Sequence, residues 1–402
     1  MNGPRVLIII QNLWVPFDRR VWLECKALVA SGYDVTVVCP KGPGDPSYQV
    51  IDGVTVHQYK AYAPGGSKLG FVTEYAYSFL MTLRLVLRAR MAGKFQVLQA
   101  CNPPDIFWPI AMLLRRLDRT RFVFDHHDLC PELFQSRFGG TTSLPYKGLR
   151  FLERMTHRKA DHVISTNDSY RRIAITRSGK ANHDVTVVRT GPDPDKLRRD
   201  SSGADESRQM LRRGHRYLVT YIGVMGPQDG VDIVVRAADH IVNKLGRTDV
   251  AFTLMGGGDS FDDVVALRDE LGLGDHVEFT GRVPDETVRA VMSTADLGLS
   301  PDPKNPLNDV STMNKTMEYM AFELPVVAFD LVETKVSAQD AAVYATPNSV
   351  EEYADAALAL LADDVTRKEM GARGRRRVED VLAWRNQVPA YVGVYDRLTA
   401  AG

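Results

Sequence analysis

The sequence lacks the features that mark several large classes of protein. It has four cysteines among 402 residues, with no Cys-x-x-Cys pair, so we expect buried free thiols rather than a disulfide framework or a zinc site. No uncharged apolar run reaches the ~18 residues that span a bilayer. The run Val6–Ile10 is too short for the apolar part of a secretion signal. We therefore expect a cytoplasmic protein.

The net charge is zero, but the charges are distributed unevenly along the chain. Lys and Arg total 50, as do Asp and Glu. Residues 1–190 carry 26 basic and 15 acidic side chains, a net charge of +11, and the other 24 basic and 35 acidic side chains give −11. Because no aromatic-basic RNA motif, zinc finger or helix-turn-helix pattern is present, we expect no nucleic acid partner. A phosphate-bearing acceptor or the inner face of a membrane suits the basic half better.

The residues that are present follow the pattern of a globular α/β protein. Hydrophobic residues make up 44% and charged residues 25%, and short aliphatic runs alternate with helical patterns from end to end. Right-handed crossovers would wind such runs into two doubly wound parallel sheets. The expected strands are Val6–Ile10, Val35–Cys39, Val54–Tyr59, Val97–Ala100, Phe122–Asp125, His162–Ser165 and Val185–Val188, then Tyr217–Ile222, Ala251–Met255, Val277–Thr280, Leu297–Ser300, Val326–Phe329 and Val343–Ala345.

The length fits two domains and a connector. We predict a Rossmann-like domain over residues 1–190, a linker over 191–214, and a second Rossmann-like domain over 215–382. The linker is rich in proline and charge and has no apolar run of core size. The helical pattern breaks near Trp384 and then resumes, so residues 383–402 form either a simple terminal helix or one that returns to the first domain.

A long apolar and aromatic pattern covers Phe71–Met91, with arginines near its end. It predicts an amphipathic helix that faces the core and whose basic end is favoured by the helix dipole. The alternative is a helix that lies on a membrane surface.

In open α/β sheets, ligands bind beyond the carboxyl ends of the strands. Three loops at such ends in the second half are rich in glycine. The loop Gly223–Gly230 lets backbone N–H groups approach a phosphate, although a plain tight turn is the alternative. The glycines of Met255–Asp259 indicate close approach of some group, while Asp259 is also a candidate helix N-cap. The segment Thr280–Pro284 offers a backbone edge for reading a base.

A fourth segment, Ser300–Met320, runs from a polar loop into a helix, with Ser311 or Thr312 as the expected N-cap. Lys315 and Glu318 are three residues apart and share a helix face. A buried ammonium there would neutralise a diphosphate, and a carboxylate would accept two hydrogen bonds from a ribose diol. The alternative is a surface ion pair worth under ~1 kcal/mol.

A fifth segment, Phe124–Glu132, places two histidines between carboxylates just past a strand. Adjacent residues of an extended chain point in opposite directions, so they chelate a metal poorly. We therefore expect no metal. Instead, a single histidine is expected to face the ligand cleft, and a structural histidine is the alternative for His126.

These five loops, in this order and spacing, resemble the retaining glycosyltransferases of family 4, which have the GT-B fold. That α/β fold has two face-to-face Rossmann-like domains with parallel sheets and a C-terminal helix returning to the N-domain. The resemblance is most specific at Met313–Ala321 with Pro325–Val327, and at Gly281–Pro284. The segments Asp18–Val21 and Asp125–Glu132 support it.

The resemblance implies transfer of a hexosyl or N-acetylhexosaminyl group from a nucleoside diphosphate sugar, a UDP-sugar first, to an acceptor hydroxyl. The acceptor would be lipid-linked or part of a cell-envelope glycan, polysaccharide or glycoconjugate, and the scheme needs no metal or other cofactor. Because no nucleophilic carboxylate pair is visible, a front-face mechanism is expected. The alternatives are a sugar-nucleotide epimerase, a catalytically weak binding partner of another transferase and, remotely, a nucleic-acid-binding protein.

The resemblance also implies roles for individual residues. The catalytic residues would be His127, Lys315 and Asp309. The donor would be bound by Gly223, Val224, Met225, Gly226, Gln228, Gly256, Gly257, Arg282, Val283, Ser311, Thr312, Met313, Asn314, Lys315 and Glu318, and the acceptor by Asn12, Trp14, Arg19 and Arg20.

Three positions depart from the family pattern. Val224 and Asp229 stand where many members have Arg and Lys, so Lys315 and backbone amides are expected to hold the phosphates. Val310 stands where the family has an acidic residue, and Asp309 lies one position away.

Overall fold

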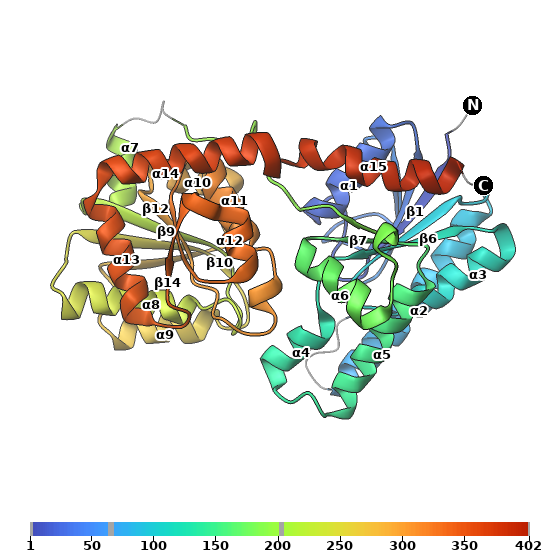
Figure 1. Cartoon of the computed structure of the whole chain (residues 1–402), viewed down its shortest axis with the longest axis horizontal. Helices are drawn as coiled ribbons and strands as arrows, with labels where there is room; N and C mark the ends of the chain where they lie inside the picture. The colour runs from blue at the N-terminus through green and yellow to red at the C-terminus, as the bar shows by residue number, and fades with distance from the viewer. Residues whose placement is uncertain (1–2, 63–67, 201–204, 401–402) are drawn as a thin grey trace. The chain divides into compact units, whose positions relative to one another are not determined.

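The computed structural model describes residues 3–62, 68–200 and 205–400. The chain forms two compact units: unit 1 comprises residues 1–189 and 387–402, and unit 2 comprises residues 190–386. Each unit has its own parallel sheet covered by helices (Figure 1). The predicted fold class, two Rossmann-like α/β domains with a C-terminal helix, is confirmed.

Unit 1 is built on an eight-stranded sheet in the order β3-β4-β2-β1-β5-β6-β7-β8. All neighbouring strands are parallel except β3, which pairs antiparallel with β4. The strand order reverses direction at β1, which lies between β2 and β5. The strands are β1 Arg5–Ile9, β2 Asp34–Pro40, β3 Tyr48–Ile51, β4 Val54–Tyr59, β5 Val97–Cys101, β6 Arg121–His126, β7 His162–Ser165 and β8 Val185–Val187.

Strand β3 is the one strand of the described chain that the sequence pattern did not predict. It joins β4 through Asp52 and Gly53, whose φ angles of 48° and 82° make a tight two-residue hairpin. An Asp-Gly pair between two β-branched runs is a hairpin signal, so the sequence did contain the information.

The helices of unit 1 cover both faces of this sheet. Asp18 caps the first of them, because its carboxylate accepts a hydrogen bond from the backbone N–H of Val21. Strand residues such as Leu7, Leu98 and Phe122 are fully buried beneath the helices. The helices are α1 Arg19–Ala30, α2 Lys68–Arg90, α3 Trp108–Asp118, α4 Cys130–Phe138, α5 Leu144–Lys159, α6 Asp168–Ser178 and the last helix, α15 Trp384–Ala400.

Helix α15 begins in unit 2 and continues into unit 1 (Figure 1). The Tyr33 hydroxyl donates a hydrogen bond to Asp396 Oδ1 at 2.6 Å. Tyr391 and Tyr395 are fully buried. Of the two expectations for residues 383–402, the structure has the helix that packs on the N-terminal unit.

Unit 2 is built on a six-stranded parallel sheet in the order β11-β10-β9-β12-β13-β14, which reverses direction at β9. The strands are β9 Tyr217–Val224, β10 Val250–Gly257, β11 Val277–Gly281, β12 Leu297–Ser300, β13 Val326–Phe329 and β14 Ala342–Ala345. The helices are α7 Asp205–Arg212, α8 Val231–Asp239, α9 Phe261–Glu270, α10 Asp285–Thr294, α11 Asn314–Ala321, α12 Val332–Ala338, α13 Val350–Ala362 and α14 Asp364–Arg377.

Residues 191–214 are not a free linker. They belong to unit 2 and include α7, while residues 201–204 lie outside the described part. Arg375 on α14 donates to the backbone oxygens of Pro194 and Leu197 at 2.9 and 2.8 Å. Leu197 and Leu211 of this segment also pack against the core of unit 2.

Two expectations about the whole chain can be compared with the structure. All four cysteines are buried free thiols, as predicted. Within the described residues, no helix combines the length and the apolar character that crossing a membrane requires.

Helix α2 has one buried and one exposed face. Ser78, Thr82, Val86 and Ala89 are buried, which agrees with the predicted core-facing helix. The opposite face nevertheless presents apolar side chains to solvent. They are Val72, Leu80 and Leu87, with exposed fractions of 64, 63 and 40%, and they are followed directly after the helix by Met91, which is 80% exposed.

A group of buried acidic side chains lies under the helices of unit 1. Asp105 and Glu153 are at most 3% exposed. Arg177 forms ion pairs with Glu153, at 3.1 Å, and with Glu132. Burial, reinforced by the Glu153 charge, raises the pKa of Asp105 to about 7.

We predict that Asp105→Asn stabilises the protein more at pH 8 than at pH 5. The folded state raises the pKa of the Asp105 carboxyl. Its contribution to the free energy of unfolding is therefore fully favourable below about pH 4 and is lost as pH rises through about 7. The relative gain at pH 8 should be about 1–3 kcal/mol, seen as a higher midpoint of thermal unfolding. The exposed Asp262→Asn serves as control, and an equal effect of Asp105→Asn at both pH values would contradict the prediction.

Candidate active site

The site in unit 2 lies at the reversal point of its sheet, beyond the carboxyl ends of β9 and β12. Ligands of open α/β sheets bind at such points. The two loops that follow these strands touch each other: a Cβ on Gly230 would lie 2.2 Å from the carbonyl oxygen of Pro301. The Asn308 side chain also donates to the carbonyl oxygen of Gln228 at 2.8 Å. The sequence segments 223–230 and 300–320 therefore form one site.

The glycine at position 256, at the end of β10, is required by the close approach of β9. Gly223 and Gly256 are partners in the strand register, with φ angles of 153° and 138°. A Cβ on Gly256 would lie 1.8 Å from the Gly223 oxygen, whereas a Cβ on Gly257 would meet nothing within 4 Å. The group that approaches Gly256 is thus the neighbouring strand, and Gly257 has the open space.

Lys315 lies beside this glycine loop, with its Cε 3.5 Å from the Cβ that an alanine at position 223 would have. Its ammonium donates to Asp302 Oδ1 at 2.6 Å, and both side chains are at most 10% exposed. Burial lowers the pKa of Lys315, but Asp302 and Asp229 outweigh it and raise the pKa overall. Lys315 is therefore charged but already paired, and Asp302 is the acidic partner that the sequence reading did not identify.

Two helices begin at this site without a side-chain cap. The N-cap of α11 is Met313 rather than Ser311 or Thr312, and the Ser311 hydroxyl donates instead to the Leu307 carbonyl at 2.8 Å. The N-cap of α8 is Gly230. Uncapped N-termini leave backbone N–H groups that favour an anion.

Asp229 stands where many family members have Lys, and its carboxylate accepts hydrogen bonds within its own loop. Its Oδ2 accepts from the Gly226 N–H at 2.9 Å and from the Gln228 side-chain amide at 3.1 Å. Val224 is 59% exposed and Met225 is fully buried. Among the other predicted donor residues, Arg282 and Asn314 are exposed, and Val283, Thr312 and Glu318 are partly buried.

Asp309 takes a structural position. Its Oδ1 accepts a hydrogen bond from the backbone N–H of Val332 at 3.1 Å, at the start of α12, and lies 3.5 Å from Lys304 Nζ. An aspartate at a helix N-terminus is favoured by the helix dipole. Its predicted catalytic role gains no support from these contacts.

In unit 1, a cavity of about 290 Å³ lies beyond the carboxyl ends of β1, β2 and β4. The predicted acceptor residues Asn12 and Trp14 line it, and Arg19 and Arg20 do not. Gln11 donates to Glu74 Oε1 at 3.1 Å within the lining. The other polar and aromatic lining residues are Lys41, Tyr59, Tyr62, Tyr75 and Ser78.

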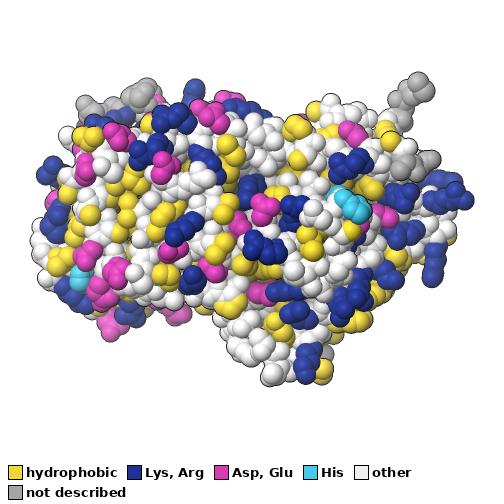
Figure 2. Space-filling view, viewed as in Figure 1, with side chains coloured by type: hydrophobic (Ala, Val, Ile, Leu, Met, Phe, Trp, Pro, Cys, Tyr) yellow, Lys and Arg dark blue, Asp and Glu magenta, His cyan; other side chains and the backbone are white. Residues whose placement is uncertain are grey.

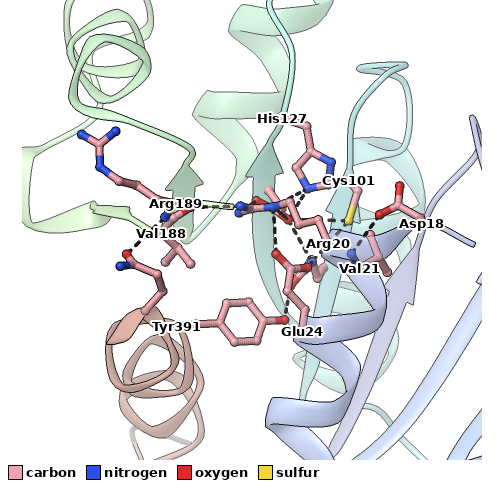
Figure 3. Close-up of polar contacts among 12 residues, drawn as sticks. Asp18, Arg20, Val21, Glu24, Cys101, His127, Val188, Arg189 and Tyr391 are labelled. Carbon is pink, nitrogen blue, oxygen red and sulfur yellow. Dashed lines mark hydrogen bonds and ion pairs between the residues drawn. The ribbon is translucent and has the colours of Figure 1, made fainter. Parts of the chain in front are cut away.

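Arg20 is buried and bound, which corrects its expected role as an acceptor ligand. Its guanidinium donates to Asp125 Oδ1 at 2.8 Å and to the Val188 carbonyl at 3.0 Å, and lies 3.0 Å from Glu24 Oε1 (Figure 3). Burial alone would lower its pKa, but Asp125 and Glu24 raise it. Arg20 therefore holds the buried carboxylates in place, while Arg19 is exposed.

His127 and His126 point in opposite directions, as predicted. His127 Nε2 contacts Asp125 Oδ2 and lies 3.0 Å from Arg20 Nε, and its side chain is 13% exposed. His126 is fully buried among Phe124, His157 and Tyr170. Burial holds the pKa of His126 well below its usual value, so it is a neutral structural residue.

In the part of the chain that the structure describes, one set of metal-ligating atoms lies close together, from Glu24, Cys101, Asp125 and His127. The Arg20 guanidinium already supplies the positive charge there. Burial and the Asp125 charge also raise the pKa of Cys101, which favours a thiol over a metal-binding thiolate. These residues suit an arginine better than a metal.

Two family models match the chain. Residues 18–196 match "Glycosyltransferase Family 4" and residues 216–363 match "Glycosyl transferases group 1". The chain is 26% identical over 309 residues to a GDP-mannose-dependent alpha-(1-6)-phosphatidylinositol monomannoside mannosyltransferase of Mycobacterium tuberculosis, covering 75% of this chain and 69% of that protein. An uncharacterized glycosyltransferase of Methanocaldococcus jannaschii is 22% identical over 390 residues, 93% of each protein.

Solved structures show the same fold. A sucrose-phosphate synthase from Thermosynechococcus elongatus aligns with a TM-score of 0.81 at 17% identity, covering 99% of this chain and 100% of that one. A glycosyltransferase involved in lipopolysaccharide biosynthesis aligns with a TM-score of 0.71 at 16% identity, covering 96% and 98%. The chain therefore belongs to the family 4 glycosyltransferases and has the GT-B fold.

We predict that Gly256→Ala and Gly257→Ala differ sharply in stability. The new methyl group at position 256 would overlap the Gly223 carbonyl and force β9 and β10 apart, at a cost of more than ~2 kcal/mol. At position 257 the methyl group has open space, so the cost should stay below ~1 kcal/mol. Urea unfolding measures both, and equal losses would show that the strands do not approach as described.

Proposed function

We propose that the chain transfers a sugar from a nucleoside diphosphate sugar to an acceptor hydroxyl with retained configuration. The observation that carries the proposal is the meeting of a glycine loop, two uncapped helix N-termini and Lys315 beyond β9 and β12. Backbone N–H groups arranged in this way favour a diphosphate. Membership of family 4 supports the transferase chemistry.

In this proposal, the diphosphate is held mainly by backbone. Lys315 can turn further ammonium N–H groups toward a phosphate while one remains with Asp302. Glu318 binds the ribose hydroxyls, and the backbone near Arg282 and Val283 borders the base. As the bond to the sugar breaks, the same N–H groups stabilise the charge that develops on the leaving diphosphate.

A front-face reaction fits these residues better than a double displacement. Retention through a covalent intermediate needs a carboxylate nucleophile beside a second carboxyl group. Asp309, the carboxylate predicted from the sequence, is engaged at the start of α12, and Asp302 is paired with Lys315. The acceptor hydroxyl therefore attacks from the side on which the diphosphate leaves, with His127 beside the transferred sugar, and no metal or other cofactor takes part.

The names of the relatives favour GDP-mannose over the UDP-sugar expected first. Several are mannosyltransferases of mycobacterial phosphatidylinositol glycolipids. The cavity of unit 1 offers a carboxylate, amides and aromatic rings, which are groups that bind the hydroxyls and faces of a sugar or cyclitol. We therefore propose a polyol acceptor, carried on a lipid or glycan.

We predict that GDP-mannose stabilises the protein more than UDP-glucose or UDP-N-acetylglucosamine. A ligand at 100 times its Kd adds about 2.7 kcal/mol of stability, a shift of several degrees. Glu318→Ala should remove most of the shift, because the ribose contact is lost, whereas the exposed Glu351→Ala should keep it. If no sugar nucleotide raises the unfolding temperature, the donor site is wrong; a shift with UDP-sugars alone would reassign the nucleotide.

We also propose that unit 1 contacts an anionic membrane. Lys and Arg side chains predominate over the visible face of unit 1, in keeping with the +11 charge of residues 1–190 (Figure 2). The apolar strip of α2, with exposed Leu80 and Met91, is flanked by exposed Arg84 and Arg88. Apolar residues beside cations bind the interface of an anionic bilayer.

Helix α5 provides a second strip of this kind, which the sequence reading did not identify. Leu144 and Phe151 are 83% and 59% exposed and share a face with the exposed Lys147 and Arg154. Residues at these spacings lie on one side of a helix. Either strip would bring unit 1 to a lipid-carried acceptor.

We predict that the protein sediments with phosphatidylglycerol-containing vesicles and not with pure phosphatidylcholine. Leu80→Glu with Met91→Glu should weaken binding at least tenfold if α2 makes the contact, since each apolar side chain contributes about 1.5–3 kcal/mol when buried. Leu144→Glu with Phe151→Glu tests α5 in the same way. The control Val365→Glu changes an exposed apolar residue of unit 2. Unchanged sedimentation of both double variants would exclude these surfaces.

A further inference from the structure

The last helix inserts two tyrosine hydroxyls into the interior of unit 1. Tyr391 and Tyr395 are one turn apart on α15, and their oxygens lie 3.0 Å from each other. Both hydroxyls contact the side-chain oxygen of Gln99 on β5, Tyr391 at 2.9 Å. All three residues are fully buried. The oxygen end of the Gln99 amide is therefore surrounded by hydroxyl groups.

The nitrogen end of the same amide faces two buried carboxyl groups. Gln99 Nε2 donates to Glu24 Oε2 at 2.7 Å and to Asp125 Oδ2 at 3.3 Å. An amide NH₂ has two protons, so both are used. Reversing the amide would place its oxygen against the carboxyl groups. The chemistry on both sides thus fixes one orientation.

Asp125 links the hydrogen bonds of Gln99 to His127. The oxygen that accepts from Gln99, Oδ2, is also the oxygen that contacts His127 Nε2. Although burial would raise the pKa of Asp125, Arg20 and His127 lower it overall, so the carboxylate is ionised. Arg20 Nε–H lies 3.0 Å from His127 Nε2 and 3.3 Å from Asp125 Oδ2. When Nε2 carries the proton that Asp125 accepts, this N–H donates to the carboxylate instead of the ring, and Nδ1 is the ring nitrogen left to accept from a ligand. Figure 3 shows the His127 ring with one nitrogen turned toward Arg20.

We propose that Gln99, Tyr391 and Tyr395 are positioning residues that hold the ring and tautomer of His127 for sugar transfer. The proposal rests on the function proposed above and adds that the C-terminal helix is part of the machinery of the N-terminal unit. A helix that needed only an anchor could use apolar contacts, which avoid the cost of burying two hydroxyls, an amide, two carboxyl groups and a guanidinium. The polar chain instead ends on the one member of the cluster that the family resemblance assigns to catalysis.

The test combines kinetics of sugar transfer with nitrogen-15 spectra of the His127 ring. The double variant Tyr391→Phe/Tyr395→Phe keeps the apolar packing and removes both hydroxyls. We expect kcat to fall about tenfold with the KM for the donor nearly unchanged, because a small misplacement of a reacting group has a cost of this order. In a His127→Ala background the same pair should change kcat less than about twofold, since interacting residues are not additive.

Nitrogen-15 spectra of the imidazole rings, with His127 assigned from His127→Ala, supply a readout that needs no turnover. The wild-type protein should show His127 protonated on Nε2, and the double variant or Gln99→Leu should show a mixture of tautomers. Tyr391→Phe alone is the milder variant if the double variant folds poorly. Tyr33→Phe is the matched control, because it removes an α15 hydrogen bond to Asp396 and leaves Gln99 untouched.

The outcomes separate the proposals. A wild-type tautomer in the double variant and in Gln99→Leu, or an equal loss of kcat in the His127→Ala background, would overturn the positioning role and leave only an anchor. Loss of the single tautomer in a protein without transferase activity would support the hydrogen-bond chain and refute the proposed function instead.

Discussion

The buried guanidinium of Arg20 is the interaction on which the N-terminal unit depends. It joins α1 to β6 through Asp125 and to the end of β8 through the Val188 carbonyl. Burial and the Asp125 charge raise the pKa of Glu24, so Asp125 is the carboxylate that balances Arg20. Removing one member of a buried ion pair leaves an uncompensated charge and costs about 3–5 kcal/mol. Arg20 thus supports the fold and the position of His127 together.

In unit 2, the equivalent constraint comes from backbone contacts rather than from charge. Its site exists because β9 and β10 run so close together that Gly256 must lack a side chain, and because Gly230 allows its loop to touch Pro301. These contacts place the first turns of α8 and α11 beside Lys315. Glycine in this unit therefore allows backbone to approach backbone, and the ligand can approach only where space remains, as at Gly257.

Local patterns in the sequence predicted most of the fold, because parallel strands buried on both faces read as short aliphatic runs. Strand β3 was missed because half of its residues are exposed, although the Asp52-Gly53 turn marked it. The site was predicted less completely. Lys315 could be placed on a helix and His127 in a loop, and Asp125 lies only two residues before His127. Asp302, the acidic partner of Lys315, is 13 residues away and is brought to it by tertiary structure, which spacing along the chain does not encode.

Unit 2 has Val224 and Asp229 where many family members have Arg and Lys. Asp302 and Asp229 are the acidic side chains that act on Lys315, and the formal charges of these three residues sum to −1. Asp229 is turned into its own loop by the Gly226 N–H, and Asp302 is neutralised by Lys315. Each uncapped helix N-terminus contributes about half a positive charge, and two of them offset that −1. Under the proposed function, attraction for a diphosphate then comes from the direction of individual N–H groups, so the geometry of the loops matters more than their net charge for binding the proposed donor.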